Sequence, residues 1–355
     1  MQNQMLWRLP GSEIMTFGVD VITGEPSLSP LFYFSYCNAS TLQVVQDTYR
    51  GNTYIIPPEL HAQSSPKCSF SMVSNTYSSS SEMSNEMAQN SGKTDSLINI
   101  GMILTCSLGV SASASAEGGW GEINGKVSAA YSKEKSVEQA KSLESKQSGS
   151  LISTEVGCET SKVKMTKNTF HPSFLEDLAQ ARTSDDYLKL VKRYGTHYYK
   201  RATLGGKLKQ ITAMSKTLSK SKTEQEQSQS AQRSFGASIS SPVFSVSGDY
   251  SDSSDSSVKG SDQQEFENQS SRSTVITYGG PPGSFGPSTS DAPSNFGDWA
   301  SNIDLLPVPI DYELESITSI IPDEWKLPDG TSIKSMWNQS ALEYEYSLDI
   351  ASSSK

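Results

Sequence analysis

The chain contains 355 residues, of which 35% are hydrophobic and 19% are charged, and its formal net charge is -10. This length is enough for one large domain or two ordinary ones with a substantial core. The acidic balance argues against nucleic acid, and against anionic lipid held by bulk charge, because both require a basic surface. The chain has no run of about eighteen apolar residues, so the sequence predicts no transmembrane helix.

The first part of the chain, residues 14–77, predicts an entry segment followed by short strands. The clearest strands are residues 52–57 and 68–77, which are bounded by glycine and proline. Residues 1–10 lack the apolar core of a signal peptide.

A serine-rich segment at residues 78–157, the first insertion, alternates apolar and polar residues. The apolar positions are even before Gly118 and Gly119 and odd after them, as expected if these glycines form the tip of a hairpin. The alternation argues against the simpler interpretation of a disordered polar segment. The predicted apolar, membrane-facing side consists of Leu108, Val110, Ala112, Ala114, Ala116, Ile123, Val127 and Ala129.

The middle of the chain predicts strand, helix and strand in succession. Residues 156–165 read as a strand, and residues 172–194 carry apolar side chains at the spacing of one amphipathic helix. Gly195 should end this helix, because glycine takes a left-handed conformation without a side-chain penalty. Residues 196–212 then predict a strand that bends at Gly205–Gly206, where missing side chains allow close approach of another element.

A second polar insertion, residues 212–273, repeats the alternation less regularly. Its predicted hairpin tip is Ser241 and Pro242, and a four-residue tip in the same register is favoured because proline suits a two-residue turn poorly. The predicted membrane face consists of Phe235, Ala237, Ile239, Phe244 and Val246.

The end of the chain predicts a strand at residues 274–278, a loop rich in Gly, Pro and Ser, and a closing segment at residues 295–322. We therefore expect one domain over residues 1–322 and a short C-terminal tail over residues 323–355.

One motif carries a family resemblance, which the opening run 18–26 and the segments 278–282 and 299–317 extend to roughly residues 14–322. The motif is Tyr194, Gly195, Thr196, His197 and Tyr198, followed after six residues by Gly205 and Gly206. It resembles the signature of the membrane attack complex/perforin (MACPF) superfamily at every fixed position. The resemblance implies an α+β fold, a bent and twisted central antiparallel sheet flanked by two helical clusters that can convert to transmembrane β-hairpins.

Physical chemistry points the same way. A hairpin with one apolar and one polar face cannot cross a bilayer alone, because its edge amides and carbonyls would lack partners in hydrocarbon. A ring of identical chains, each donating two hairpins, would close the edges into a large β-barrel. Before insertion, residues 81–89 and 133–146 predict short helices packed against the sheet.

We therefore expect a secreted pore-forming protein that binds the lipid membrane of a target cell, forms a ring-shaped homo-oligomer and acts in cytolysis, immune defence or as a toxin. The alternative is a non-lytic member of the same fold that acts in adhesion, signalling or as a partner subunit of a pore complex. Membrane targeting would come from a separate subunit, from a further module, or from the tail with Trp325 and Trp337.

His197 is the one candidate for catalysis or metal binding, but His61 and His171 lie at no recognised ligand spacing from it. A hydrogen-bonded structural histidine is favoured. The run Asp249, Asp252 and Asp255 lacks the bidentate glutamate of a calcium loop. Since no nucleophile elbow or phosphate-binding loop occurs, we expect no enzyme, no metal and no cofactor.

Three further sets of residues remain. A disulfide among Cys37, Cys68 and Cys158 is compatible with hairpin formation, whereas Cys106 lies within the first hairpin. Glycosylation sequons occur at Asn38, Asn268 and Asn338. Basic residues around the signature form either an exposed charged face or a contact with an acidic edge of a neighbouring subunit. These are Lys192, Arg193, Lys200, Arg201, Lys207 and Lys209.

Overall fold

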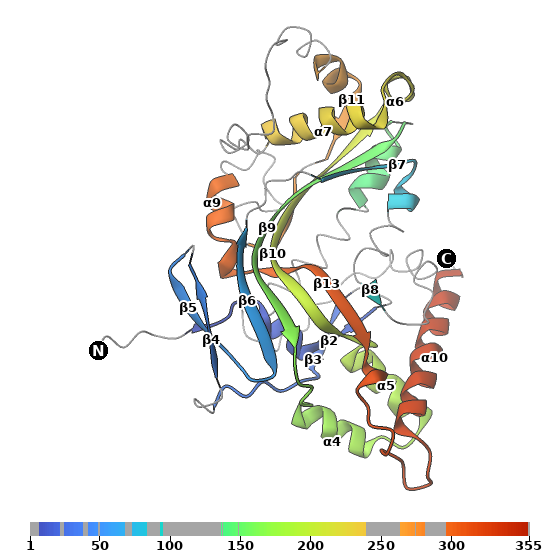
Figure 1. The fold of residues 1–355 in the computed structure, drawn as a ribbon. Helices are drawn as coiled ribbons and strands as arrows, with labels where there is room; N and C mark the ends of the chain where they lie inside the picture. The colour runs from blue at the N-terminus through green and yellow to red at the C-terminus, as the bar shows by residue number, and fades with distance from the viewer. Residues whose placement is uncertain are drawn as a thin grey trace.

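Figure 1 shows the fold in a computed structural model of the chain. The structure describes residues 7–21, 25–37, 42–48, 50–67, 73–83, 93–94, 136, 138–147, 149–238, 263–273, 275–280 and 296–353.

The described residues form short strands, two long strands, α-helices and 3-10 helices. The strands are β1 (Trp7–Arg8), β2 (Phe17–Asp20), β3 (Glu25–Pro30), β4 (Gln43–Asp47), β5 (Asn52–Ile56), β6 (Leu60–Lys67), β7 (Val73–Tyr77), β8 (Lys93–Thr94), β9 (Leu151–Met165), β10 (His197–Met214), β11 (Ser270–Arg272), β12 (Ile276–Tyr278) and β13 (Val308–Ser316). The α-helices are α4 (Pro172–Gln180), α5 (Ser184–Tyr194), α6 (Lys216–Ser221), α7 (Glu224–Ser238), α9 (Phe296–Ser301) and α10 (Ile333–Ser353), and the 3-10 helices are η1 (Ser12–Thr16), η4 (Ile303–Leu305) and η5 (Ile317–Ser319).

Two long antiparallel strands, β9 and β10, form the middle of a bent sheet that runs along the molecule (Figure 1). Beyond β9, β6 pairs with its later part and β7 with its beginning. Beyond β10, β13 pairs with its first half, whereas β12 and β11 pair with its second half. Among the described strands, β9 and β10 are therefore the two that cross the bend. We call the part with β6 and β13 the lower half and the part with β7, β11 and β12 the upper half.

The two long strands extend further than the sequence predicted. β9 begins at Leu151 and not at residue 156, and β10 continues to Met214. Apart from β8, which pairs with β13, the described residues between Tyr77 and Leu151 and between Met214 and Ser270 lie outside the sheet.

The predicted single helix at residues 172–194 is wrong, because the structure has α4 and α5 with a break between them. Thr183 caps the second helix: its hydroxyl accepts from the Asp186 amide, and the Asp186 carboxylate accepts from the Thr183 amide. This reciprocal capping satisfies amides that have no partner within the helix, which favours a new helix start at this point. The predicted apolar stripe is nevertheless buried, as the positions of Phe174, Tyr187 and Val191 show.

The largest core among the described residues lies in the lower half, where α4, α5 and α10 pack against the sheet and against β2 and β3. Aromatic side chains dominate its centre, and Phe32, Phe174, Tyr194 and Trp337 are fully buried. Aromatic rings bury large apolar areas, so this cluster supplies much of the stabilisation of the lower half.

The residues expected to form a short tail contain α10, which packs along α5 (Figure 1). Trp337 is part of the core and meets Phe174 edge to face at 5.7 Å between ring centroids. The Tyr344 hydroxyl donates a hydrogen bond of 2.7 Å to Asp20. Trp337 is therefore not available for membrane binding in this conformation. None of the helices within the described ranges has the length and apolar composition needed to span a bilayer.

Candidate functional site

The first half of the signature lies where the chain leaves α5 and enters β10. Gly195 follows the last helical residue with φ 88°, a left-handed conformation that favours glycine. A Cβ atom on Gly195 would lie 2.7 Å from the backbone of Val19, and one on Gly18 would overlap the Tyr194 carbonyl oxygen. The two glycines therefore let the α5–β10 turn and β2 pass in direct backbone contact.

Thr196 links the α5–β10 turn to β2. Its amide donates to the Val19 carbonyl oxygen at 2.9 Å, and its hydroxyl accepts from the Val21 amide at 3.2 Å. The signature thereby ties the start of β10 to β2 through both backbone and side chain.

His197 is buried beside the same turn, with 1% of its surface exposed, and its Nδ1 lies 2.9 Å from the Thr196 hydroxyl. Burial lowers the pKa of His197 to about 4, so the ring is neutral near pH 7. An imidazole without solvent contact cannot meet a dissolved substrate in this conformation. Within the described ranges, no group of three His, Cys, Asp or Glu side chains is placed to hold a metal ion.

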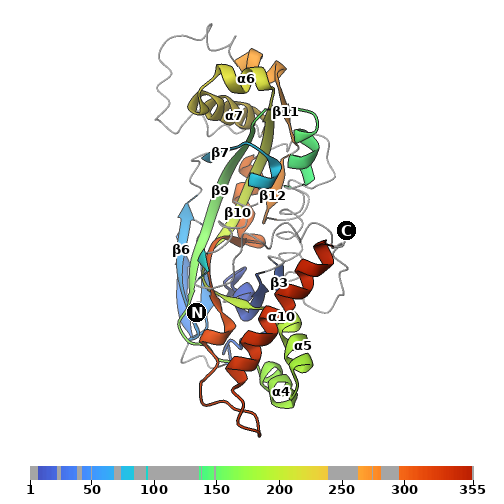
Figure 2. The same cartoon turned by 90° about the vertical axis from the view of Figure 1, so that its right-hand side faces the viewer.

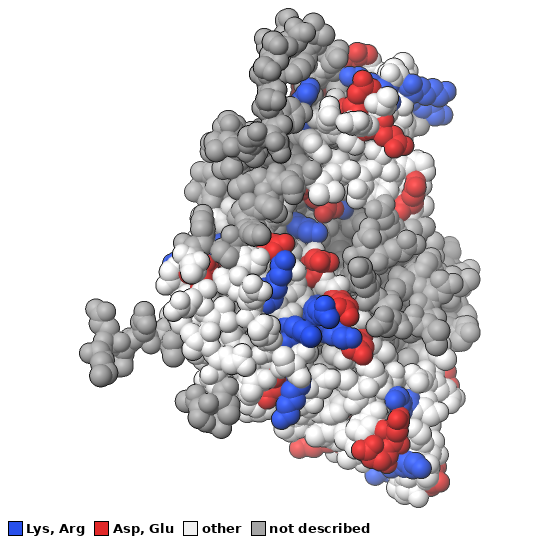
Figure 3. Space-filling view, viewed as in Figure 1, with Lys and Arg blue, Asp and Glu red and all other residues white. Residues whose placement is uncertain are grey.

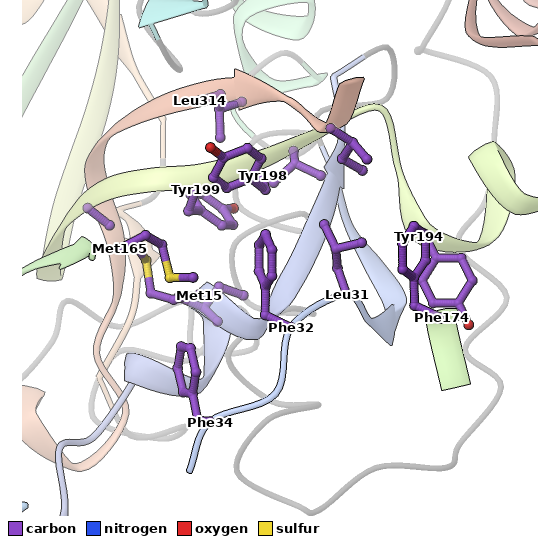
Figure 4. Close-up of a cluster of buried hydrophobic side chains, with 14 of the residues drawn as sticks. Met15, Leu31, Phe32, Phe34, Met165, Phe174, Tyr194, Tyr198, Tyr199 and Leu314 are labelled. Carbon is purple, nitrogen blue, oxygen red and sulfur yellow. The ribbon is translucent and has the colours of Figure 1, made fainter. Parts of the chain in front are cut away.

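The two tyrosines of the signature anchor it to the lower core. Tyr194 donates a hydrogen bond of 2.7 Å to Asp177, and Tyr198 donates one of 3.0 Å to Glu315. Burial, reinforced by these carboxylates, raises the pKa of Tyr194 and raises that of Tyr198 to about 12. Both rings also meet core phenylalanines edge to face, at 5.0 and 5.2 Å between centroids (Figure 4).

The second half of the signature, Gly205–Gly206, occupies the bend of β10. Gly205 is the last residue of β10 that pairs with β13, and the residues after Gly206 pair with β12. A Cβ atom on Gly205 would overlap the Cys158 carbonyl oxygen, and one on Gly206 would lie 2.5 Å from the Ile303 side chain. The predicted close approach at these glycines is therefore present, and η4 is one of the elements that approach.

The helices that flank the first insertion pack on the upper half of the sheet. Residues 80–83 and 138–144 are helical, as the sequence predicted. The Glu144 carboxylate accepts hydrogen bonds from the amide and hydroxyl of Ser80, which joins the two helices. Together the helices and the sheet bury Tyr77, Met83, Ala140, Leu143, Leu151, Ile211, Ala213 and Ile276.

A buried ion pair lies on the same side of the sheet, near the first-insertion helices. The Lys209 ammonium is 3.0 Å from a Glu155 carboxylate oxygen, and the Lys209 side chain is 4% exposed. Burial raises the pKa of Glu155, but Lys209 and Lys207 lower it by more, so the net shift is downward. Burial lowers the pKa of Lys209, but Tyr278 and Glu155 raise it by more, so the net shift is upward. Ser136, from the first insertion, lies 2.9 Å from the Tyr278 hydroxyl.

The second insertion is also helical where it is described, through α6, α7 and residues 263–268. Its contacts with the sheet are largely polar: the Ser234 hydroxyl accepts from Arg272 at 2.7 Å, and the hydroxyls of Ser150 and Ser219 lie 2.5 Å apart. One small cluster buries Ile152, Met214, Leu218, Ala231 and Phe266, and a second buries Val156, Cys158, Leu208, Phe235, Trp299, Ala300 and Ile303.

Only part of the predicted hairpin surface can be located. Phe235 is fully buried on α7, and Ala237 belongs to the same helix. The other members lie outside the described residues: Leu108, Val110, Ala112, Ala114, Ala116, Gly118, Gly119, Ile123, Val127, Ala129, Ile239, Ser241, Pro242, Phe244 and Val246.

The two insertions cover opposite faces of the upper sheet. Side chains alternate between the faces of a strand. Leu151 and Ile211 contact the first-insertion helices, whereas Ile152 and Met214 contact the second-insertion helices. Figure 2 shows α7 and the green helix at residues 138–144 on either side of the β9–β10 ribbon. Helices of the two insertions therefore cover both faces of the upper sheet.

The basic residues around the signature make ion pairs within the chain. Lys200 contacts Glu313 and Glu315, Arg201 contacts Glu313, and Arg193 contacts Asp177. Figure 3 shows basic and acidic side chains interleaved over the described part of this face, above the central strands. Because their partners are internal, these residues form a balanced charged face in this conformation.

The cysteines and sequons are only partly described. Cys37 carries a free and exposed thiol, so it takes no part in the predicted bridge here. Cys158 is fully buried and disulfide-bonded, and Cys68 and Cys106 lie outside the described residues. Asn268 and Asn338 are exposed on helices, where a glycan would meet solvent, and Asn38 is not described.

Three solved structures align with most of this chain. GNIP1Aa from Chromobacterium piscinae is 18% identical with a TM-score of 0.63, over 97% of this chain and 57% of that one. A putative cell invasion protein with a MAC/Perforin domain from Bacteroides thetaiotaomicron is 10% identical with a TM-score of 0.45, over 96% and 63%. Astrotactin-2, a vertebrate perforin-like membrane protein, is 12% identical with a TM-score of 0.44, over 95% and 46%.

The chain thus spans a little over half the length of GNIP1Aa, and the likeness to that protein supports the shared fold. No curated protein matches the sequence significantly. The profile of the MAC/Perforin domain matches residues 9–346, which include the signature, the bent sheet and most of α10. This chain belongs to the MACPF family.

Proposed function

We propose that this protein is a secreted, non-enzymatic pore former that binds membranes, assembles into a ring of identical subunits and inserts two amphipathic β-hairpins per subunit. The ring would enclose a large β-barrel in the membrane of a target cell, in cytolysis, immune defence or as a toxin. A separate subunit or a further region of the protein would supply recognition of the membrane.

The observation that carries the proposal is the relation between the long strands and the insertions. β9 begins where the first insertion ends, and β10 ends where the second begins. These strands are adjacent and antiparallel. Each insertion could therefore lengthen an existing strand pair, with no new strand order in the sheet.

The strand register of the second insertion supports this extension. Met214 lies opposite Ser270 in the β10–β11 pair. Pro242 is midway between them in the sequence, so a hairpin extended from this register would turn at the predicted tip, Ser241 and Pro242. A single β-bulge would bring the predicted apolar pairs into line.

The first insertion fits less simply. Tyr77 lies opposite Leu151 in the β7–β9 pair. Ala114 is midway between them, before the predicted tip at Gly118 and Gly119. The arm that follows β7 would thus be about nine residues longer than the other, and a loop near its base would absorb the surplus.

The interfaces that hold the stored helices also support release. They bury serine, threonine and glutamine beside small apolar clusters, for example Ser136, Thr212, Gln227 and Ser234. Net stabilisation by a hydrogen bond is only about 1 kcal/mol, so such an interface is weaker than an aromatic core of the same area. The stored helices can therefore detach while the lower half stays folded.

The test is leakage of a dye from vesicles, combined with electron microscopy of the same samples. Vesicles of phosphatidylcholine alone, with phosphatidylserine and with sterol should be compared over a range of pH. Dye release with ring-shaped particles is expected. Intact vesicles without rings under all of these conditions would contradict lysis by this chain alone and would favour the non-lytic alternative in adhesion, signalling or partnership. Full leakage by a folded His197→Gln variant would exclude a catalytic role for that residue.

A further inference from the structure

Arg50, beside the turn between β4 and β5, lies at the centre of a buried charged cluster. Its guanidinium is 3.2 Å from Asp47 and 3.3 Å from Asp304, and it donates a hydrogen bond of 3.4 Å to the Ala300 carbonyl oxygen. The three charged side chains are between 5% and 15% exposed. Asp47 is local to the same hairpin, whereas Asp304 and Ala300 belong to η4 and α9, far along the chain.

The same segment of α9 and η4 packs against the bend of the central sheet. Ile303 is fully buried and would be 2.5 Å from a Cβ atom on Gly206. The Trp299 indole donates to the Gly279 carbonyl oxygen at 3.3 Å, and the Gly280 amide donates to the Leu306 carbonyl oxygen at 2.9 Å. The segment from Trp299 to Leu306 thus has the bend on one side and Arg50 on the other.

Figure 1 shows the β4–β5 hairpin beside the orange segment that holds α9. A small pocket between them is lined by apolar residues, among them Leu9, Pro10 and Pro307, and by polar ones, among them Asp47, Ser161 and Asp304. The buried hydroxyl of Ser161 has no hydrogen-bond partner within the described residues. The charged cluster around Arg50 therefore adds a direct polar link, beside these apolar residues, between the small sheet and the segment that covers the bend.

We propose that the Arg50–Asp304 ion pair is a brace that holds the central sheet in its bent form. While the pair is intact, Ile303 stays wedged over Gly206 and the Gly280–Leu306 hydrogen bond stays closed. Loss of the pair lets the Ile303 side chain move away from Gly206, so the bend of β10 opens more easily. A brace of this kind links the small sheet to the bend, and it operates whether or not the protein perforates membranes.

Hydrogen exchange by mass spectrometry tests the brace without reference to membranes. Asp304→Asn removes the carboxylate charge that Arg50 meets on η4, and Asp47→Asn, the matched control, removes the carboxylate charge that it meets within its own hairpin. Asp304→Asn should speed exchange about tenfold in peptides that cover residues 205–210 and 275–280, because opening there becomes easier. Asp47→Asn should change those peptides less than about twofold, and Asp304→Glu should restore protection. Peptides from α5 should exchange as in the parent protein in each variant.

Arg50→Lys is a second way to weaken the brace. It keeps the positive charge, but an ammonium group cannot contact Asp47, Asp304 and the Ala300 carbonyl oxygen at once as the guanidinium does. It should produce the regional pattern of Asp304→Asn at smaller amplitude. Equal exchange in Asp304→Asn and Asp47→Asn would overturn the proposal, and so would faster exchange confined to residues 299–306. Vesicle leakage without this regional pattern would contradict the brace and leave the proposed pore function intact.

Discussion

The lower and upper halves of the central sheet share β9 and β10 but are held in different ways. The described part of the lower half has one continuous core built around fully buried aromatic side chains from α4, α5, α10 and the segment that follows β3. Within the described residues, the upper half has three small clusters under the insertion helices and α9, together with buried Ser, Thr and Gln and the Lys209–Glu155 ion pair. In the proposed function, the lower half is the permanent body and the upper half is the support from which the insertion helices leave.

The largest effect is expected where the signature joins the permanent body. Gly195→Ala should destabilise the protein by about 4 kcal/mol or prevent folding, because the new Cβ would meet the Val19 backbone in a left-handed conformation. Gly330→Ala is the matched control, since Gly330 has the same φ of 88° and a Cβ atom added there would have no atom within 4 Å. It should cost about 1 kcal/mol. Denaturant unfolding of both variants measures the difference, and equal losses would refute the close-contact explanation.

Substitution of one fully buried phenylalanine in each half allows a direct comparison of the two halves. Phe174→Ala in the lower core should reduce the free energy of global unfolding by about 4 kcal/mol. Phe235→Ala should reduce it by less, because α7 can detach before the body unfolds, and should instead speed hydrogen exchange in α7. Denaturant unfolding with hydrogen exchange of each variant gives the test. Equal global losses with no selective opening of α7 would mean that the halves unfold as one unit.

The pH dependence of stability reports on His197. Its pKa in the folded protein is about 4, whereas histidine in an unfolded chain titrates near pH 6.5. Between these values the unfolded chain binds a proton that the folded protein does not. Stability should therefore fall by roughly 3 kcal/mol as the pH decreases from about 6.5 to about 4, with no contribution from this group above that window. His197→Gln should remove this slope, and His61→Gln, at an exposed position, should retain it. An unchanged profile in His197→Gln would assign the slope to other groups.

The ion pair of the upper half should have a smaller effect. Lys209→Met should cost roughly 2 kcal/mol, because Glu155 keeps Lys207 as a partner and is partly exposed. The surface pair of Arg201 and Glu313 is the comparison, and Arg201→Met should cost less than about 1 kcal/mol. Hydrogen exchange should also increase in residues 138–144 of Lys209→Met. If the two variants lose the same stability, burial of the Lys209 pair has no special role.

Local signals in the sequence identified the parts of the fold that depend on nearby residues. Gly195 was predicted to end a helix and does so, and the glycines of the bend were predicted to admit another element and do so. The division between α4 and α5 was missed, although Thr183 and Asp186 form a capping pair that the sequence displays. The apolar stripe continued across the break, and its helical period outweighed the capping signal.

Contacts between distant residues were not predictable in this way. Lys209 meets Glu155 only because β9 and β10 pair in one register, and no local pattern specifies that register. The same holds for Arg50 and Asp304, which lie on different elements. Phe235 and Ala237 show another limit: their alternation suits a strand, yet they lie in α7. In the proposed function, that alternation belongs to the second conformation of the segment.

The central claim is that the insertion helices must leave the sheet for the protein to act. Ser150→Cys with Ser219→Cys, in a Cys37→Ser background, should form a disulfide because the two hydroxyls lie 2.5 Å apart. In an extended hairpin the same positions would be separated by roughly 17 Å, at 3.3 to 3.4 Å per residue. Ser74→Cys with Thr154→Cys, which joins β7 to β9 in both conformations, is the control.

Dye release from vesicles should be compared before and after reduction of each disulfide. We predict that the oxidised Ser150–Ser219 variant leaves vesicles intact and that reduction restores leakage, whereas the control variant leaks in both states. Leakage of equal rate from the oxidised and reduced forms of the Ser150–Ser219 variant would contradict the account.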